Sequence, residues 1–98
     1  MSGEELKQHI ARMGEGQRTV LRHMANGLWL NCMPRGRGQR QCSVGDRYMR
    51  IPLKTSLYVS LRSRDWLFDR HETKIEEGLL VTYTLKLTYV EAIKILIS

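Results

Sequence analysis

The stretch RIPLKTSLYVSLRSRDWLF, residues 50–68, carries the pattern that decides the fold. Leu53, Leu57 and Leu61 recur every four residues, which is the spacing of one face of a helix. Pro52 suits the first turn of such a helix, where its missing N–H costs nothing. The stretch therefore predicts an amphipathic helix over 53–64, with hydroxyl groups and an arginine on the face opposite the leucines.

The chain after this helix alternates apolar and polar residues, as a half-buried strand does. The alternating apolar residues are Leu79, Val81, Tyr83, Leu85 and Leu87. We predict a hairpin over 66–88, turning at residues 76–78, and a closing helix over 89–97. The apolar side of that last helix either packs against the first helix or forms a homodimer interface.

The N-terminal half predicts two helices and a second hairpin. Ser2 caps a helix over 1–13, and Asn26-Gly27 ends a second helix that starts near residue 15. A short strand at 28–32, a glycine- and arginine-rich loop at 34–41 and an extended segment at 42–51 follow. The order of elements predicts an α+β fold in which residues 1–98 form a single domain.

The positive charge is concentrated in the middle of the chain. The formal charge is +6, but residues 35–64 alone hold eight arginines and lysines against Asp46, a charge of +7. Clustered cations suit phosphate binding, because each neutralised phosphate releases condensed counterions. We expect these guanidinium groups to form one continuous positive strip shared with the exposed side of the 53–64 helix.

No other chemistry competes with this charge in the sequence. Cys32 and Cys42 could face each other across the first hairpin and, with His23, suggest a metal, but the spacing matches no zinc pattern, so we expect buried free thiols. The histidines lack a nucleophile and an orienting acid nearby. We therefore expect neither an enzyme, nor a metal, nor a cofactor. The large aromatic residues are expected in the core.

Localisation is also an expectation from composition. Two cysteines and the acidic start MSGEELKQHI are unlike a secreted protein and its signal, so we expect a cytoplasmic protein. Every apolar run is shorter than the roughly 18 residues that a membrane span needs, so we expect no membrane partner.

Three segments resemble the winged-helix branch of helix-turn-helix proteins, in the small form common in bacteria and phages. EGQRTVLRHMANGLWL (15–30) resembles their first helix, LYVSLRSRDWL (57–67) their recognition helix entering the wing, and YTLKLTYVEA (83–92) their last strand and helix. Two departures stand out. Asp65 replaces the usual glycine, so a left-handed turn there falls to aspartate, and the 65–78 wing is net acidic and should repel DNA.

The resemblance implies double-stranded DNA binding by a small bacterial or phage transcription regulator. Arg62 and the hydroxyls would reach base edges, and the loop arginines would hold phosphates. The predicted nucleic-acid-binding residues are Arg35, Arg37, Arg40, Arg47, Arg50, Lys54, Thr55, Ser56, Val59, Arg62 and Ser63.

Two other partners remain open. The acidic hairpin could be the working surface of a phage protein that binds a host protein complex and inhibits a nucleic-acid machine, as an anti-CRISPR protein does. RNA is a third candidate, because arginine-glycine loops also suit RNA.

Overall fold

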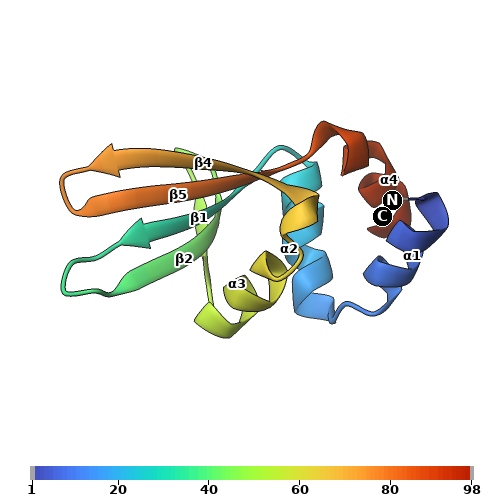
Figure 1. Ribbon diagram of the computed structural model, residues 1–98, viewed down its shortest axis with the longest axis horizontal. Coiled ribbons are helices and arrows are strands. Elements are labelled where there is room, and N and C mark those ends of the chain that lie inside the picture. The colour runs from blue at the N-terminus through green and yellow to red at the C-terminus, as the bar shows by residue number, and fades with distance from the viewer. Residues whose placement is uncertain (1, 98) are drawn as a thin grey trace.

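The structure is a computed structural model that describes residues 2–97, so the first residue of the predicted 1–13 helix and the last residue of the predicted domain lie outside it. Figure 1 shows helices gathered at one end and two long hairpins projecting from the other. The elements are α1 (Gly3–Ala11), α2 (Glu15–Ala25), β1 (Trp29–Pro34), β2 (Arg40–Gly45), β3 (Arg50–Leu53), α3 (Thr55–Arg62), the short 3-10 helix η1 (Asp65–Leu67), β4 (Phe68–Ile75), β5 (Gly78–Leu85) and α4 (Leu87–Ile97).

Helix α1 covers Gly3–Ala11 of the predicted 1–13 helix, and α2 begins and ends close to its predicted bounds. The Ser2 hydroxyl accepts a hydrogen bond from the Glu5 amide at 3.2 Å and so caps α1. Gly27 takes a φ of 98° directly after the Asn26 cap, which ends α2 in the left-handed conformation that glycine adopts easily.

The predicted α+β class is confirmed, because the strands form one antiparallel sheet in the order β3-β2-β1-β5-β4. The two predicted hairpins are joined through β1 and β5, where Cys32 lies opposite Val81. The inward face of the sheet packs against α2 and α3. The most deeply buried side chains of the shared core are Leu21, Leu30, Val44, Leu61, Leu67 and Ile93.

The structure departs from a helix-turn-helix arrangement before α3. Such a motif joins two helices by a turn of three or four residues, whereas β1, β2 and β3 stand between α2 and α3. The prediction that Pro52 opens the helix was wrong. Pro52 pairs with Ser43 in the edge strand β3, where an outer N–H is not needed, and α3 starts at Thr55.

The turn after α3 also differs from the expectation. Among the described residues, the only non-glycine residue with a positive φ is Arg37, so Asp65 does not make a left-handed turn. Asp65 instead starts η1, and the Leu67 amide bonds to the Arg64 carbonyl at 3.0 Å. One tight 3-10 turn thus replaces the glycine and leads the chain into β4.

The last helix packs inside the helical end of the molecule. Helix α4 contacts α2 and α1 and buries Ile93 and Ile97, so part of its apolar side packs within the chain, while a homodimer interface stays a prediction. Leu87 remains 90% exposed at its start. Within residues 2–97, no helix has the length and apolar character needed to cross a bilayer.

Candidate nucleic-acid interface

The tip of the β1–β2 hairpin presents two exposed arginines on a tightly folded loop. Gly36, Arg37 and Gly38 have φ values of 77°, 52° and 74°, so three successive residues are left-handed. The Arg35 amide bonds to the Gln39 carbonyl at 2.9 Å and closes the loop. Glycine accepts this conformation readily, which allows Arg35 and Arg37 to stand at the far end of the molecule.

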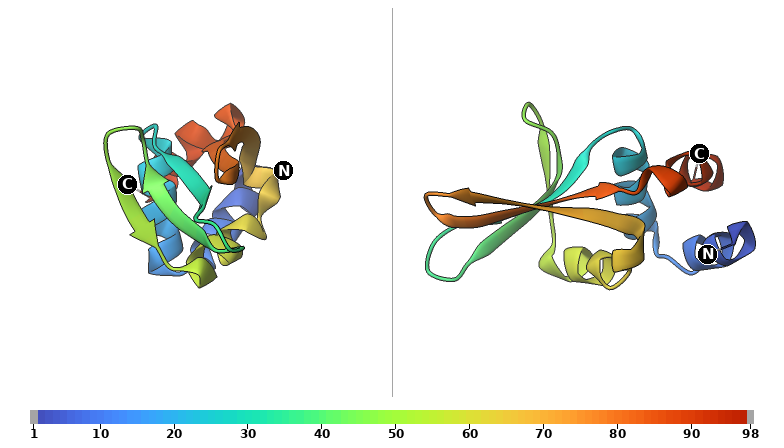
Figure 2. Two further views of the ribbon diagram at one scale, coloured as in Figure 1. Left: turned by 90° about the vertical axis from the view of Figure 1, so that its left-hand side faces the viewer. Right: turned by 45° about the horizontal axis from the view of Figure 1, so that its top comes forward.

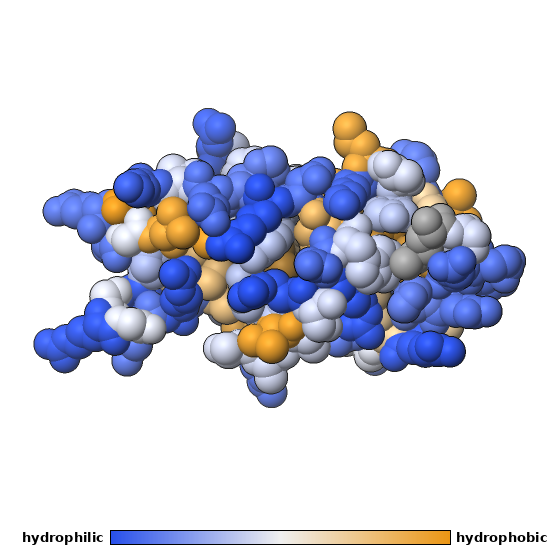
Figure 3. Space-filling view, in the orientation of Figure 1, coloured by the Kyte–Doolittle hydropathy of each residue, from blue (hydrophilic) through white to orange (hydrophobic). Residues whose placement is uncertain are grey.

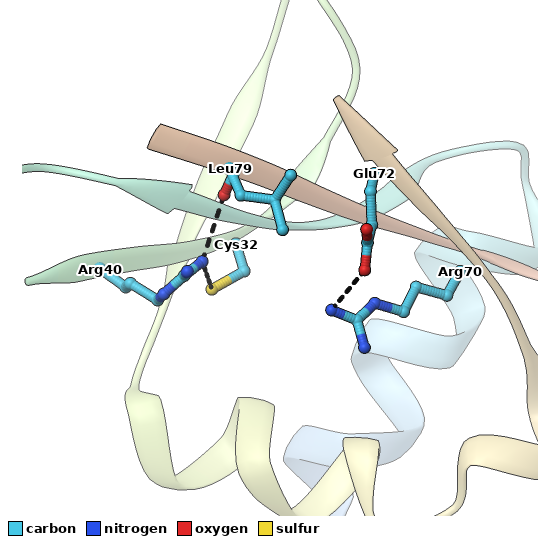
Figure 4. A network of polar contacts seen from close by, with 5 residues as sticks. All are labelled: Cys32, Arg40, Arg70, Glu72 and Leu79. Carbon is cyan, nitrogen blue, oxygen red and sulfur yellow. Dashed lines mark hydrogen bonds and ion pairs between the residues drawn. The ribbon is translucent and has the colours of Figure 1, made fainter. Parts of the chain in front are cut away.

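Arg40 lies on the inward face of the sheet, because side chains alternate along β2 and Cys42 and Val44 point to the core. Its Nη1 lies 3.3 Å from the Leu79 carbonyl and 3.6 Å from Cys32 Sγ (Figure 4). Leu79 lies past the last β1–β5 pair, so this guanidinium bridges the place where the hairpins separate. The hydrogen bond to Cys32 raises the pKa of Arg40, which stays charged.

A cleft of about 350 Å³ opens beneath the hairpins, between the sheet and α3. Figure 4 shows Arg40 and Arg70 reaching into the same space from different strands, above the pale yellow-green α3. Arg62 joins them from α3, with its Cζ 6.0 Å from the centre of the Tyr58 ring. The cleft thus gathers three guanidinium groups from β2, α3 and β4.

Arg70 is a residue that the sequence interpretation missed. It was counted as part of an acidic wing, but its pairing with Tyr83 places it on the same face as Phe68 and the core. The sequence contains this information, because residues two apart on a strand share a face, so a buried Phe68 predicts that Arg70 points to the same side. Its Nη2 binds Glu72 Oε1 at 2.8 Å, and both side chains are about half exposed, so this ion pair neutralises only one of the three arginines.

Two buried groups of the cleft, Tyr58 and Cys42, are neutral at physiological pH. Burial, followed by hydrogen bonds to Tyr83 and Cys32, raises the pKa of Tyr58 and keeps its hydroxyl protonated. Burial raises the pKa of the Cys42 thiol to about 11. Arg40, Arg62 and Arg70 with Glu72 therefore set the charge of the cleft, which is positive.

The outer face of α3 adjoins this cleft. Lys54, just before α3, is exposed, and so are the five residues predicted to form that face: Thr55, Ser56, Val59, Arg62 and Ser63. Thr55, Val59 and Arg62 line the cleft, so hydroxyl, methyl and guanidinium groups open onto one surface. Ser63 differs from the others because its hydroxyl proton is already used: Ser63 Oγ donates a hydrogen bond to the Ser60 carbonyl at 2.6 Å.

Two predicted arginines lie elsewhere, so the prediction of one continuous strip was wrong. Arg47 sits in the turn between β2 and β3, which projects away from both hairpin tips (Figure 2, right). Arg50 pairs with Gly45 on the sheet face opposite Cys42 and the core. Sequence proximity did not translate into one face, because the chain reverses at residues 46–49 and the pleat alternates. Trp29, expected in the core, is 37% exposed.

The chain matches no protein-family model, no curated protein and no solved structure. Function is therefore inferred from the arrangement of the cleft, α3 and the basic tip. Among residues 2–97, no three histidine, cysteine or acidic side chains gather as metal ligands would.

Proposed function

We propose that the protein binds nucleic acid, with double-stranded DNA as the ligand, through α3 and the β1–β2 hairpin. The observation that carries this proposal is that Arg40 and Arg62, from a strand and a helix, line one cleft. Arg35 and Arg37 lie farther out on the β1–β2 hairpin that carries Arg40, in the loop beyond the cleft. Phosphates spaced along a backbone would meet these cations in succession, because guanidinium groups hold phosphate oxygens through paired N–H donors.

Helix α3 has the size and surface for groove contact. A helix with its side chains is about 10–12 Å across, which the roughly 12 Å wide major groove admits, and the eight residues of α3 are about 12 Å long. Thr55, Ser56 and Arg62 offer donors and acceptors, and Val59 offers a methyl surface for thymine. In this proposal α3 acts as the recognition helix of the winged-helix resemblance, although three strands precede it.

The β1–β2 hairpin takes the part of the wing. Strand β2 packs beside α3, whereas the acidic β4–β5 hairpin begins on the other side of β1 (Figure 1). Phosphates held by Arg35 and Arg37 would run from the tip toward α3. A small bacterial or phage transcription regulator, working in the cytoplasm alone or as a homodimer, is the biological setting that the resemblance adds to this proposal.

Fluorescence anisotropy with a labelled mixed-sequence duplex tests the proposal. We expect the full chain to bind the duplex, Arg62→Gln to weaken binding, and Arg47→Gln to leave it within twofold. Arg47 is a matched control because it is exposed and carries the same charge on a distant turn. Equal losses in both variants, or no duplex binding at all, would overturn the assignment. Single-stranded DNA and duplex RNA probes identify the kind of nucleic acid.

A protein partner is the second candidate, and one observation favours it. Glu76 and Glu77 are exposed at the tip of the β4–β5 hairpin, which projects from the same end as the basic tip. Such a tip would fit a basic channel of a host nucleic-acid machine, which this protein would inhibit. Retention of one stoichiometric partner from nuclease-treated host lysate, lost in the Glu76→Gln/Glu77→Gln variant, would support this function instead.

A further inference from the structure

Cys32 and Cys42 stand directly opposite each other on neighbouring strands, and both are buried and free. The Arg35 amide bonds to Gln39 one step beyond the ladder's last pair, Pro34–Arg40. Because hydrogen-bonded and non-hydrogen-bonded pairs alternate in an antiparallel ladder, the two cysteines form a non-hydrogen-bonded pair, with Cα atoms about 4.5 Å apart. Disulfides span Cα separations of about 4.4 to 6.8 Å, so the backbone already permits a bond.

The pair is placed where a small oxidant can reach it. Both cysteines are only 4% exposed, yet both line the arginine cleft, which is open to solvent. A bulky disulfide reagent would not reach sulfur atoms that are this buried, whereas hydrogen peroxide, which is little larger than water, could reach them through the cleft. Arg40 Nη1 lies 3.6 Å from Cys32 Sγ, and a neighbouring cation promotes attack by a cysteine sulfur.

We propose that Cys32 and Cys42 form a peroxide-reactive dithiol that closes reversibly into a disulfide at the floor of the cleft. The Cys32 sulfur, as thiolate, attacks one peroxide oxygen; the O–O bond breaks, hydroxide leaves, and a sulfenic acid forms. The Cys42 sulfur then attacks the Cys32 sulfur, and the sulfenic oxygen leaves as hydroxide. The two thiol protons convert both hydroxides to water, so two thiols and one peroxide give one disulfide and two waters.

The order of attack follows from the surroundings of each sulfur. Arg40 contacts Cys32, whereas burial raises the pKa of the Cys42 thiol to about 11. Cys32 is therefore the attacking residue and Cys42 the resolving one. A thiol reductant reverses the reaction by exchange. The inference is independent of which ligand the cleft binds.

Thiol counting on the intact protein tests the proposal. The full chain is treated with one to five equivalents of hydrogen peroxide, unfolded, and labelled with a maleimide, with and without prior dithiothreitol. We expect two labels before oxidation, none after it, and two again after reduction, all on monomeric chains. Two labels persisting after peroxide, loss that dithiothreitol does not restore, or disulfide-linked dimers would each overturn the proposal. Methionine oxidation does not interfere, because maleimide reports thiols alone.

Variants separate the roles of the three residues. In Cys42→Ser we expect a sulfenic acid at Cys32 that dimedone traps, and in Cys32→Ser little trapping at Cys42. Arg40→Gln should slow disulfide formation about tenfold, the effect of one charge-assisted hydrogen bond, whereas Arg47→Gln should leave the rate unchanged. Equal trapping in both cysteine variants, or an unchanged rate in Arg40→Gln with a native circular dichroism spectrum, would contradict the assigned roles.

Discussion

The two long hairpins share an architecture and differ in the chemistry of their tips. Both project from the end opposite α1 and α4, and Figure 3 shows them as separate hydrophilic prongs with a notch between them. The β1–β2 hairpin carries Arg35 and Arg37 at its tip and Arg40 at the start of β2, and we call it the basic prong. The β4–β5 hairpin carries Glu76 and Glu77 at its tip, and we call it the acidic prong. The strands still lie close together just before the two tips, since a Cβ added at Gly78 would lie 3.4 Å from Pro34 Cβ.

The comparison teaches that the net charge of the chain hides two opposite surfaces. A charge of +6 suggests a uniformly basic protein, yet one prong would attract phosphate and the other would repel it. Residues of both hairpins line the cleft, but β2 packs beside α3, so the basic tip belongs to the hairpin that leads toward this helix. An anionic polymer would therefore be oriented by attraction at one tip and repulsion at the other.

The largest expected effect comes from neutralising the basic prong. Arg35→Gln/Arg37→Gln/Arg40→Gln should weaken duplex binding by roughly two orders of magnitude, because each removes one phosphate contact. Glutamine at position 40 keeps an amide donor for the Leu79 carbonyl. Anisotropy titrations at about 0.1 M salt measure the loss, and thermal unfolding checks the fold. A loss smaller than threefold would remove the basic prong from the interface.

A single change on α3 should have the next largest effect. Arg62→Gln removes the helix's exposed guanidinium from the cleft and should weaken binding to a preferred sequence about tenfold, with a smaller loss on mixed sequence. Competition between a selected duplex and mixed-sequence DNA measures the difference. Equal losses on both would make Arg62 a phosphate contact like the residues of the basic prong.

Neutralising the acidic prong should act in the opposite direction. If DNA lies along the β1–β2 hairpin as proposed, Glu76→Gln/Glu77→Gln should tighten duplex binding about threefold at 0.1 M salt, because it removes a repulsion that acts over a Debye length of roughly 10 Å. The gain should vanish at about 0.5 M salt, where screening is shorter. A weaker complex would show that the acidic prong contributes contacts rather than repulsion.

The smallest effect concerns the stability of the two tips. Arg37→Gly replaces the strained left-handed arginine and should raise the free energy of unfolding by about 0.5 kcal/mol while lowering DNA affinity. Gly78→Ala, at a φ of 140°, should lower it by about 1 kcal/mol without lowering affinity. Urea unfolding measures both. Parallel changes in stability and affinity would mean that affinity only reports folding.

Local patterns predicted most of the elements, because each depends on neighbours in sequence. The leucine spacing gave α3 within two residues at each end, and alternation after Leu79 gave β5. Ser2 and Asn26-Gly27 marked helix ends through local hydrogen bonds and backbone conformation. Pro52 misled because proline suits a first helical turn and an edge strand equally well.

The joining of elements was not predictable in this way. The β1–β5 pairing links residues about fifty positions apart, and without it the sequence indicates two separate hairpins rather than one sheet. That pairing brings Arg70 to Arg40, whereas the β2–β3 register places Arg50 on the opposite face of the sheet. The exposed face of α3 was predicted residue by residue, whereas the cleft beside it required the long-range fold.

The salt dependence of duplex affinity tests the DNA interface most directly. If Arg35, Arg37 and Arg40 each neutralise one phosphate, log K against log salt should fall with a slope of about −2.7. The Arg35→Gln/Arg37→Gln/Arg40→Gln protein should show a slope close to zero. Identical slopes for the two proteins, or a slope near zero for the unmodified chain, would contradict phosphate binding by the basic hairpin.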